Sequence, residues 1–167
     1  MEKTIKKIIQ AQNEGLFSSY AVGGGIAALF YIEPVATFDL DVFIILPESG
    51  SPLISLSPIY SWFTEKGYRA SQEQIIIEGI AVQFIPVYNE LVKDGVIDAA
   101  EKKYGDTSVR VLKPEYLIAI MLQTLRSKDK ERLSKFLQET SVEYELLESI
   151  LHKHNLKNAL LVSRRAY

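Results

Sequence analysis

The stretch Val35-Ala-Thr-Phe-Asp-Leu-Asp-Val-Phe-Ile-Ile-Leu46 carries two carboxylates, Asp39 and Asp41, inside an otherwise apolar run. The apolar residues predict a strand over residues 38–46. Side chains on a strand alternate between the two faces of a sheet, so the two aspartates point to the same side. Neighbouring carboxylates repel each other unless a cation lies between them. Mg²⁺, which proteins hold through a few carboxylates together with substrate phosphates, suits such a pair.

Three glycines, Gly23-Gly24-Gly25, precede the aspartates. Glycine lets backbone N–H groups at the start of a helix approach a phosphate, although close packing of a helix on a strand favours glycine equally well. The triplet is neither a G-x-G-x-x-G motif nor a P-loop, because no later glycine and no Gly-Lys-Ser/Thr follows it. A glycine turn, a short helix and then an Asp-x-Asp strand bring phosphate-binding amides and metal-binding carboxylates to one edge of a sheet. Phosphoryl transfer needs that combination. The alternative is that the aspartates have no role in catalysis and are simply exposed on an edge strand or cap a neighbouring turn.

The composition is that of an ordinary globular protein. The chain has 167 residues, of which 47% are hydrophobic and 24% charged, which suits one domain or one domain with a helical appendage. A net charge of -2 gives no bulk attraction to nucleic acid. The absence of cysteine excludes disulfides and thiolate chemistry and fits a reducing cytoplasm. The first residues resemble no secretory signal and no apolar stretch is long enough to span a bilayer, so we expect a cytoplasmic protein without a membrane partner.

Hydrophobic periodicity predicts mixed helices and strands up to residue 112 and helices afterwards. We expect strands over residues 16–22, 38–46, 68–77, 80–87 and 109–112, with a tight turn at Glu78-Gly79. We expect helices over residues 2–14, 25–31, 57–66 (with Ser57 as N-cap), 89–104, 113–126, 127–137, 141–152 and 155–163. The predicted class is α+β, with a small mixed sheet, flanking helices and a C-terminal helical portion. Residues 1–112 are expected to form the α/β core, and residues 113–167 to form helices packed on it in one compact unit.

The segments Gly24-Gly25-Ile-Ala and Thr37-Phe-Asp-Leu-Asp41 resemble the nucleotidyltransferase superfamily typified by DNA polymerase beta. The chain looks most similar to small bacterial members grouped with abortive-infection and toxin–antitoxin nucleotidyltransferases. The segment from Lys113 to Asp129 is similar to the helix that follows the sheet in those proteins. The resemblance covers roughly residues 20–137 and implies a nucleotidyltransferase-like core.

The resemblance also implies roles for particular residues. Asp39 and Asp41 would be the catalytic residues and the ligands of Mg²⁺, and Gly24 and Gly25 would approach the triphosphate of a bound nucleoside triphosphate. Lys128 would contact its phosphates.

Arg126 would be the other candidate for the phosphates, although pairing of Arg126 with Asp129 explains that arginine equally well. The acceptor would be a hydroxyl of a protein, an RNA or a small molecule. The biological setting would be a toxin–antitoxin or phage-defence system.

One position departs from the family pattern. Active members carry a third acid on a later strand, and here Gln83 stands at that place in the predicted strand over residues 80–87. Glutamine is neutral and takes up no proton, so the general base is missing. Two functions stay open: an active Mg²⁺-dependent nucleotidyltransferase, and a catalytically impaired fold that acts as a nucleotide- or partner-binding module. A plain structural domain with incidental acids is the third reading.

Overall fold

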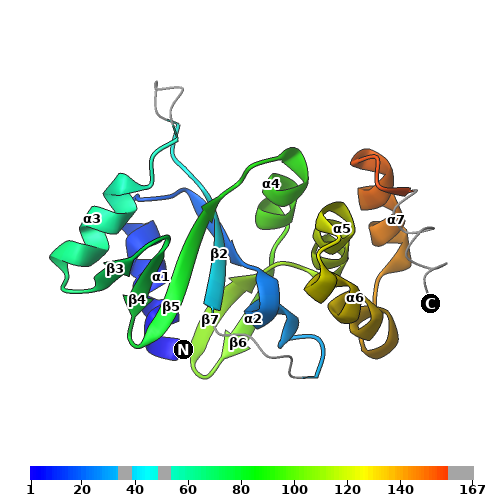
Figure 1. The fold of residues 1–167 in the computed structure, drawn as a ribbon, viewed down its shortest axis with the longest axis horizontal. Coiled ribbons are helices and arrows are strands. Elements are labelled where there is room, and N and C mark those ends of the chain that lie inside the picture. The colour runs from blue at the N-terminus through cyan, green and yellow to red at the C-terminus, as the bar shows by residue number, and fades with distance from the viewer. Residues whose placement is uncertain (34–38, 49–53, 158–167) are drawn as a thin grey trace.

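The computed structural model describes residues 1–33, 39–48 and 54–157, without the side chains of residues 127, 128, 130 and 131. Within this part, seven helices and one seven-stranded mixed sheet confirm the predicted α+β class (Figure 1). The helices are α1 (Glu2–Asn13), α2 (Gly24–Ala28), α3 (Ser57–Glu65), α4 (Glu90–Ile97), α5 (Pro114–Thr124), α6 (Ser127–Glu139) and α7 (Tyr144–Lys153). The strands are β1 (Ser19–Val22), β2 (Asp39–Ile45), β3 (Arg69–Ser71), β4 (Gln74–Ile77), β5 (Ile80–Pro86), β6 (Ala100–Tyr104) and β7 (Thr107–Val111).

The strand that carries the two aspartates lies in the middle of the sheet. The strand order is β3-β4-β5-β2-β1-β7-β6, so β2 pairs in parallel with β5 and antiparallel with β1. Leu40, Val42 and Ile44 are fully buried on one face of β2, which explains why the sequence of a central strand is nearly all apolar. Asp39 and Asp41 lie on the other face, where no apolar layer covers them completely.

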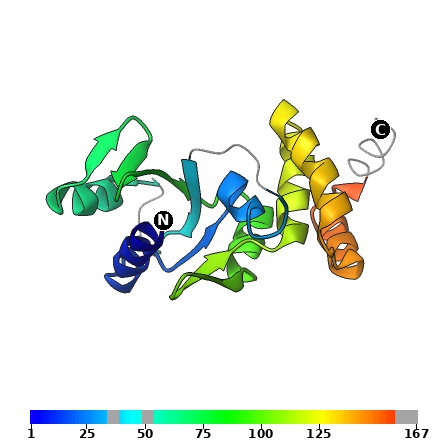
Figure 2. The ribbon, with the colours of Figure 1, turned by 90° about the horizontal axis from the view of Figure 1, so that it is seen from below.

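The helices that follow the sheet form a separate group. Eight of the eleven residues of α5 are buried, because α5 packs against α2, α4, α6 and α7. Figures 1 and 2 both show α5, α6 and α7 together at one end of the molecule, opposite α3. Helix α2 contacts both β2 and α5, so it connects the sheet to this group of helices. The proposed boundary at Lys113 stays a prediction.

One predicted strand, over residues 68–77, is wrong. The segment forms two antiparallel strands, β3 and β4, joined by a turn at Gln72-Glu73 in which Gln72 has a φ of +55°. The turn contains no glycine, asparagine or proline, so turn chemistry did not reveal it. The predicted turn at Glu78-Gly79 is confirmed, with both residues at positive φ.

The predicted helix over residues 89–104 is also too long. It ends at Ile97, and the segment Ala100–Tyr104 is instead the edge strand β6, paired antiparallel with β7. Residues Glu101-Lys-Lys103 have good intrinsic helix propensity, but the backbone hydrogen bonds offered by β7 outweigh it. The strands predicted over residues 16–22 and 109–112 are confirmed with shifted ends.

Smaller differences concern the ends of the helices, and two expectations fall outside the described residues. Helix α3 begins at Ser57, so Leu56 and not Ser57 occupies the cap position, and the Ser57 N–H donates a hydrogen bond to the side chain of Ser55. The helix predicted over residues 155–163 lies mostly outside the described residues. Thr37, which carries part of the family resemblance, also lies outside them.

Candidate nucleotide and metal site

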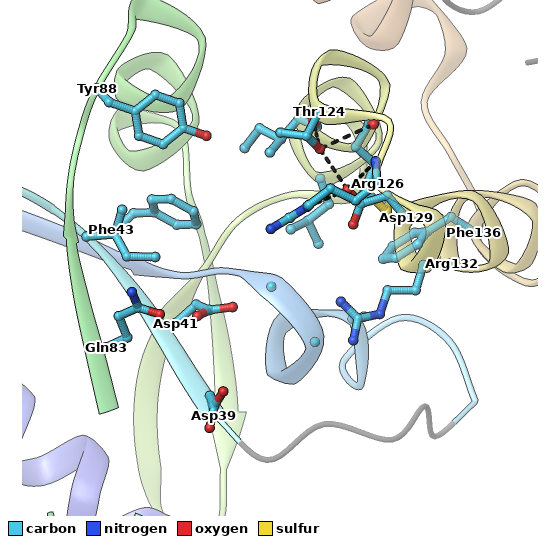
Figure 3. A pocket seen from close by; sticks show the side chains of 17 residues that line it. Asp39, Asp41, Phe43, Gln83, Tyr88, Thr124, Arg126, Asp129, Arg132 and Phe136 are labelled. Carbon is cyan, nitrogen blue, oxygen red and sulfur yellow. Dashed lines mark hydrogen bonds and ion pairs between the residues drawn. The ribbon is translucent and has the colours of Figure 1, made fainter. Parts of the chain in front are cut away.

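Strand β2 presents Asp39 and Asp41 to one face, as their spacing predicts. In the parallel pairing of β2 with β5, Asp41 is opposite Gln83, and Asp39 is opposite Ala81. The side chain of Gln83 therefore lies beside that of Asp41 (Figure 3). The register brings the glutamine that replaces an expected acid directly next to the aspartate pair.

The glycine turn lies against the same carboxylate. Gly24 has a φ of +58°, in the left-handed region that favours glycine, and a Cβ built on it would overlap the carboxylate of Asp41. A Cβ on Gly23 would overlap the ring of Phe43, and the Gly23 N–H donates a hydrogen bond to the backbone carbonyl of Asp41 at 2.9 Å. Only a backbone without side chains can pass this close to β2, which explains two of the three glycines.

Asp39, Asp41, Gly24 and Gly25 line a common cleft of about 310 Å³ between the sheet and the α5–α6 helices. Gln83 and Tyr88 also line it from the sheet side (Figure 3). Its apolar lining consists of Ala28, Phe43, Ile85, Leu117, Ile120, Met121 and Phe136. The cleft thus combines a largely apolar lining with a small number of polar and charged side chains, which is the usual makeup of a small-molecule site.

The helical wall carries an arginine that a buried carboxylate holds in place. Arg126 Nε donates to Asp129 Oδ2 at 2.8 Å, and Thr124 Oγ1 donates to the same oxygen at 2.7 Å. Asp129 is only 2% exposed. Burial by itself raises the pKa of Asp129, but the hydrogen bonds from Arg126 and Thr124 more than offset it, so the pKa lies below its usual value.

This junction answers the question that the sequence left open about Arg126. The predicted pairing of Arg126 with Asp129 is present, yet 58% of the arginine side chain stays exposed and it lines the cleft. Its two terminal amino groups have no partner among the described residues. Arg126 is therefore held by one nitrogen, which leaves the other two available at the cleft.

A second arginine, Arg132, lines the cleft from α6 and was missed in the sequence. Figure 3 shows its guanidinium directed from α6 toward the cleft. Within residues 1–33, 39–48 and 54–157, no hydrogen bond or ion pair involves Arg132. The available signal was its spacing: Arg132 lies four residues before the buried Phe136 and so shares its helix face. Lys128 also lies on α6, but its side chain is outside the described part.

The residues present fit a magnesium ion that shares its coordination with a substrate. No group of three or more His, Cys, Asp or Glu side chains that could hold a metal is found among the described residues. Asp39 and Asp41 nevertheless offer hard carboxylate oxygens on one face, with the amide of Gln83 beside them. Mg²⁺ is typically bound by one or two carboxylates, with substrate phosphates and water completing its octahedron. A site of this kind fits the pair.

Comparison with known proteins identifies the fold. No protein-family model matches the chain, and no curated protein matches it. Among solved structures, the solution structure of the antibiotic-resistance factor ANT(2'')-Ia is 16% identical with a TM-score of 0.54, covering 98% of this chain and 95% of that one. An antigenic nucleotidyltransferase-like protein from Paracoccidioides brasiliensis is 12% identical with a TM-score of 0.54, covering 97% and 90%. ANT(2'')-Ia in complex with adenylyl-2''-tobramycin is 16% identical with a TM-score of 0.53, covering 87% and 91%.

These similarities establish that the chain has the fold of the nucleotidyltransferase superfamily, as the resemblance of its glycine and aspartate motifs implied. At such low identity they speak for the fold alone. In the part of the chain that the structure describes, no helix is both long and apolar enough to cross a membrane.

Proposed function

We propose that the protein binds a nucleoside triphosphate together with Mg²⁺ in this cleft and transfers the nucleoside monophosphate to a hydroxyl acceptor. The observation that carries the proposal is the close approach of Gly24 to the carboxylate of Asp41, on a strand that presents Asp39 to the same face. Because glycine has no side chain, the backbone of α2 can approach these two hard oxygen ligands, beside which a metal-bound phosphate would lie.

In this proposal Asp39 and Asp41 hold the metal ion. Bound Mg²⁺ would supply neutralisation of the phosphate charge and orientation of the reacting oxygens. The open backbone of Gly24 and Gly25 accommodates the phosphates on the side of the cleft formed by α2.

Cations on the helical wall bind the remaining phosphate charge. Arg126, oriented by Asp129, and Arg132, which has no partner among the described residues, both line the cleft across from the aspartates. Arginine suits this task because its planar guanidinium can donate two parallel hydrogen bonds to a phosphate. Lys128 on α6 is assigned the same role from the family resemblance.

A second function, binding without transfer, is supported by Gln83. The register places this neutral side chain directly opposite Asp41, so no general base occupies that position to accept the proton of the acceptor hydroxyl. Transfer is then slow, or the protein acts as a nucleotide- or partner-binding module. The cytoplasmic location and a role in a toxin–antitoxin or phage-defence system remain part of the proposal.

Calorimetric titration with each of the four ribonucleoside triphosphates, with and without Mg²⁺, tests the binding step. We expect Mg²⁺-dependent binding that the double change Asp39→Asn and Asp41→Asn abolishes. The matched control changes Asp106→Asn and Glu65→Gln, two exposed carboxyl groups that do not line the cleft. A specific nucleotide at 100 times its Kd should also stabilise the fold by about 2.7 kcal/mol. If the wild-type protein binds none of the four triphosphates, the proposal is wrong.

Transfer of radioactive label from an α-labelled triphosphate separates the two functions. RNA, protein and aminoglycoside acceptors belong in the assay, the last because ANT(2'')-Ia is described with adenylyl-2''-tobramycin. Label transfer by the wild type eliminates the binding-module function. Transfer only after Gln83→Asp, which restores the missing acid, favours the module.

A further inference from the structure

The amide of Gln83 has a partner that no motif in the sequence suggests. Its Nε2 donates a hydrogen bond to Oε2 of Glu73 at 3.2 Å. Glu73 lies in the turn between β3 and β4, immediately before β4, and β4 runs antiparallel beside β5. The turn between β3 and β4 therefore brings a carboxylate next to Gln83, on the side away from Asp41.

This hydrogen bond decides which end of the amide faces the cleft. A carboxylate accepts hydrogen bonds and donates none, so the NH₂ group of Gln83 must face Glu73. The carbonyl oxygen of the same planar amide then points away from Glu73. Figure 3 shows this oxygen on the side of Asp41. Without Glu73, either end of the amide could face the aspartates, and the NH₂ end would compete with a cation for the Asp41 carboxylate.

We propose that Glu73 is a positioning residue that makes Gln83 an oxygen ligand for the metal ion held by Asp39 and Asp41. The inference rests on the proposed function, since it concerns the same ion. Amide carbonyl oxygens are accepted ligands of hard cations, and partners that orient a ligand are a regular part of metal sites. The charge of Glu73 also polarises the amide to which it is bonded and increases the negative charge on the carbonyl oxygen.

Glu73 and Gln83 together supply the oxygen ligand and the negative charge that a single acid at position 83 would supply alone. Gln83 contributes the oxygen, and Glu73 contributes the negative charge through its hydrogen bond to Gln83, one side chain further from the metal ion. The pair does not supply the missing base, because the amide oxygen facing the cleft takes up no proton. Compared with a site of three acids, this site would therefore still bind the metal ion but would lack the group that accepts a proton. This would explain why two aspartates are combined with a glutamine.

Two changes at Glu73 separate orientation from charge. Glu73→Gln removes the charge but keeps a carbonyl oxygen that can accept from Nε2 of Gln83, so the original orientation of the amide is still available. Glu73→Lys offers only donors, so the amide of Gln83 must turn its oxygen to the new lysine and its NH₂ group to Asp41. Glu73 is exposed in a turn, so neither change disturbs the core. Glu65→Lys on α3 is the control with the same change of charge.

The measurement is the Mg²⁺ concentration that half-saturates nucleotide binding, from calorimetric titrations at a series of Mg²⁺ concentrations. We expect it to rise about tenfold or more in Glu73→Lys, the usual effect of losing a residue that orients a metal ligand. It should rise by a smaller factor in Glu73→Gln, which loses the charge but keeps an accepting oxygen, and it should stay near the wild-type value in Glu65→Lys. Adding Gln83→Glu to Glu73→Lys should restore it, because a carboxylate that pairs with the lysine again offers oxygen to the metal.

The outcomes distinguish this inference from the proposed function. If the wild type shows Mg²⁺-dependent nucleotide binding and Glu73→Lys matches it, Glu73 does not position Gln83 and the inference alone fails. If the wild type shows no such binding, the proposed function fails and the inference with it. Side-chain amide signals of Gln83 in NMR spectra give a readout without nucleotide: the NH₂ shifts should move in Glu73→Lys, and unchanged shifts overturn the inference.

Discussion

Replacing Gly24 with alanine should destabilise the protein and remove nucleotide binding at the same time. Gly24 has a φ of +58°, and an added Cβ overlaps the carboxylate of Asp41. The left-handed conformation costs an L-residue about 1–2 kcal/mol, and forcing a packed contact apart costs about 1–3 kcal/mol more. We therefore expect the free energy of unfolding to fall by about 2–5 kcal/mol, which lowers Tm by about 2–4 °C for each kcal/mol in a chain of this size.

Gly15→Ala is the matched control for this change. Gly15 follows α1 with a φ of +82°, and a Cβ added there meets nothing within 4 Å. Its φ is farther from the left-handed minimum near about +57°, so its strain is at least as large as that of Gly24. The difference in unfolding free energy between the two variants, from urea titration, isolates the overlap with Asp41.

Nucleotide binding gives the second readout of the same pair. We expect Gly24→Ala to lose Mg²⁺-dependent binding, because its methyl group would take the place of the Asp41 carboxylate and displace this proposed metal ligand. Gly15→Ala should bind like the wild type. If Gly24→Ala is no less stable than Gly15→Ala and binds nucleotide normally, the contact between the glycine turn and Asp41 does not form the site.

Three further changes test the helical wall of the cleft. Arg132→Ala should weaken nucleotide binding roughly tenfold or more, because one charge-assisted hydrogen bond is lost, and it should leave Tm unchanged. Calorimetry measures the affinity and thermal unfolding measures Tm; an unaltered affinity would contradict the role of Arg132 in phosphate binding. Arg126→Ala should weaken binding and also lower Tm, because it leaves the buried carboxylate of Asp129 without its guanidinium partner. The pKa of Asp129 lies below its usual value of 3.8, so the ionised carboxyl stabilises the fold above pH 3.8 and this contribution is lost as the pH falls through the lowered pKa. Asp129→Asn should accordingly be less stable than the wild type near neutral pH, with a difference that shrinks below pH 3.8 in urea titrations; a difference independent of pH would rule this out.

The central strand was predictable because most of its positions are buried, which demands an apolar sequence. Against that background Asp39 and Asp41 are conspicuous, and the alternation of side chains along a strand makes their common face a local property. The buried helix α5 was predictable for a similar reason, since apolar residues all round a helix require neighbours on every side. Local patterns of this strength predicted the fold class.

Elements with weak or conflicting patterns were mispredicted. The segment Ala100–Tyr104 contains two lysines and a glutamate that favour a helix, yet it forms an edge strand because β7 offers a pairing partner. The turn at Gln72-Glu73 lacks the residues that usually mark turns, and its positive φ is imposed by the pairing of β3 with β4. In both segments, contacts with a neighbouring strand override local preference.

The sequence by itself determined one side of the site: two carboxylates on one face of a buried strand, preceded by glycines that permit close approach. These features depend on neighbouring residues in the chain, where backbone geometry leaves little choice. Only the tertiary structure decided which side chains surround the two aspartates: Arg126 and Arg132 line the opposite side of the cleft, and Glu73 is hydrogen-bonded to Gln83. Those positions depend on strand register and helix packing, which arise from burial of residues far apart in the chain and leave no local periodicity to recognise.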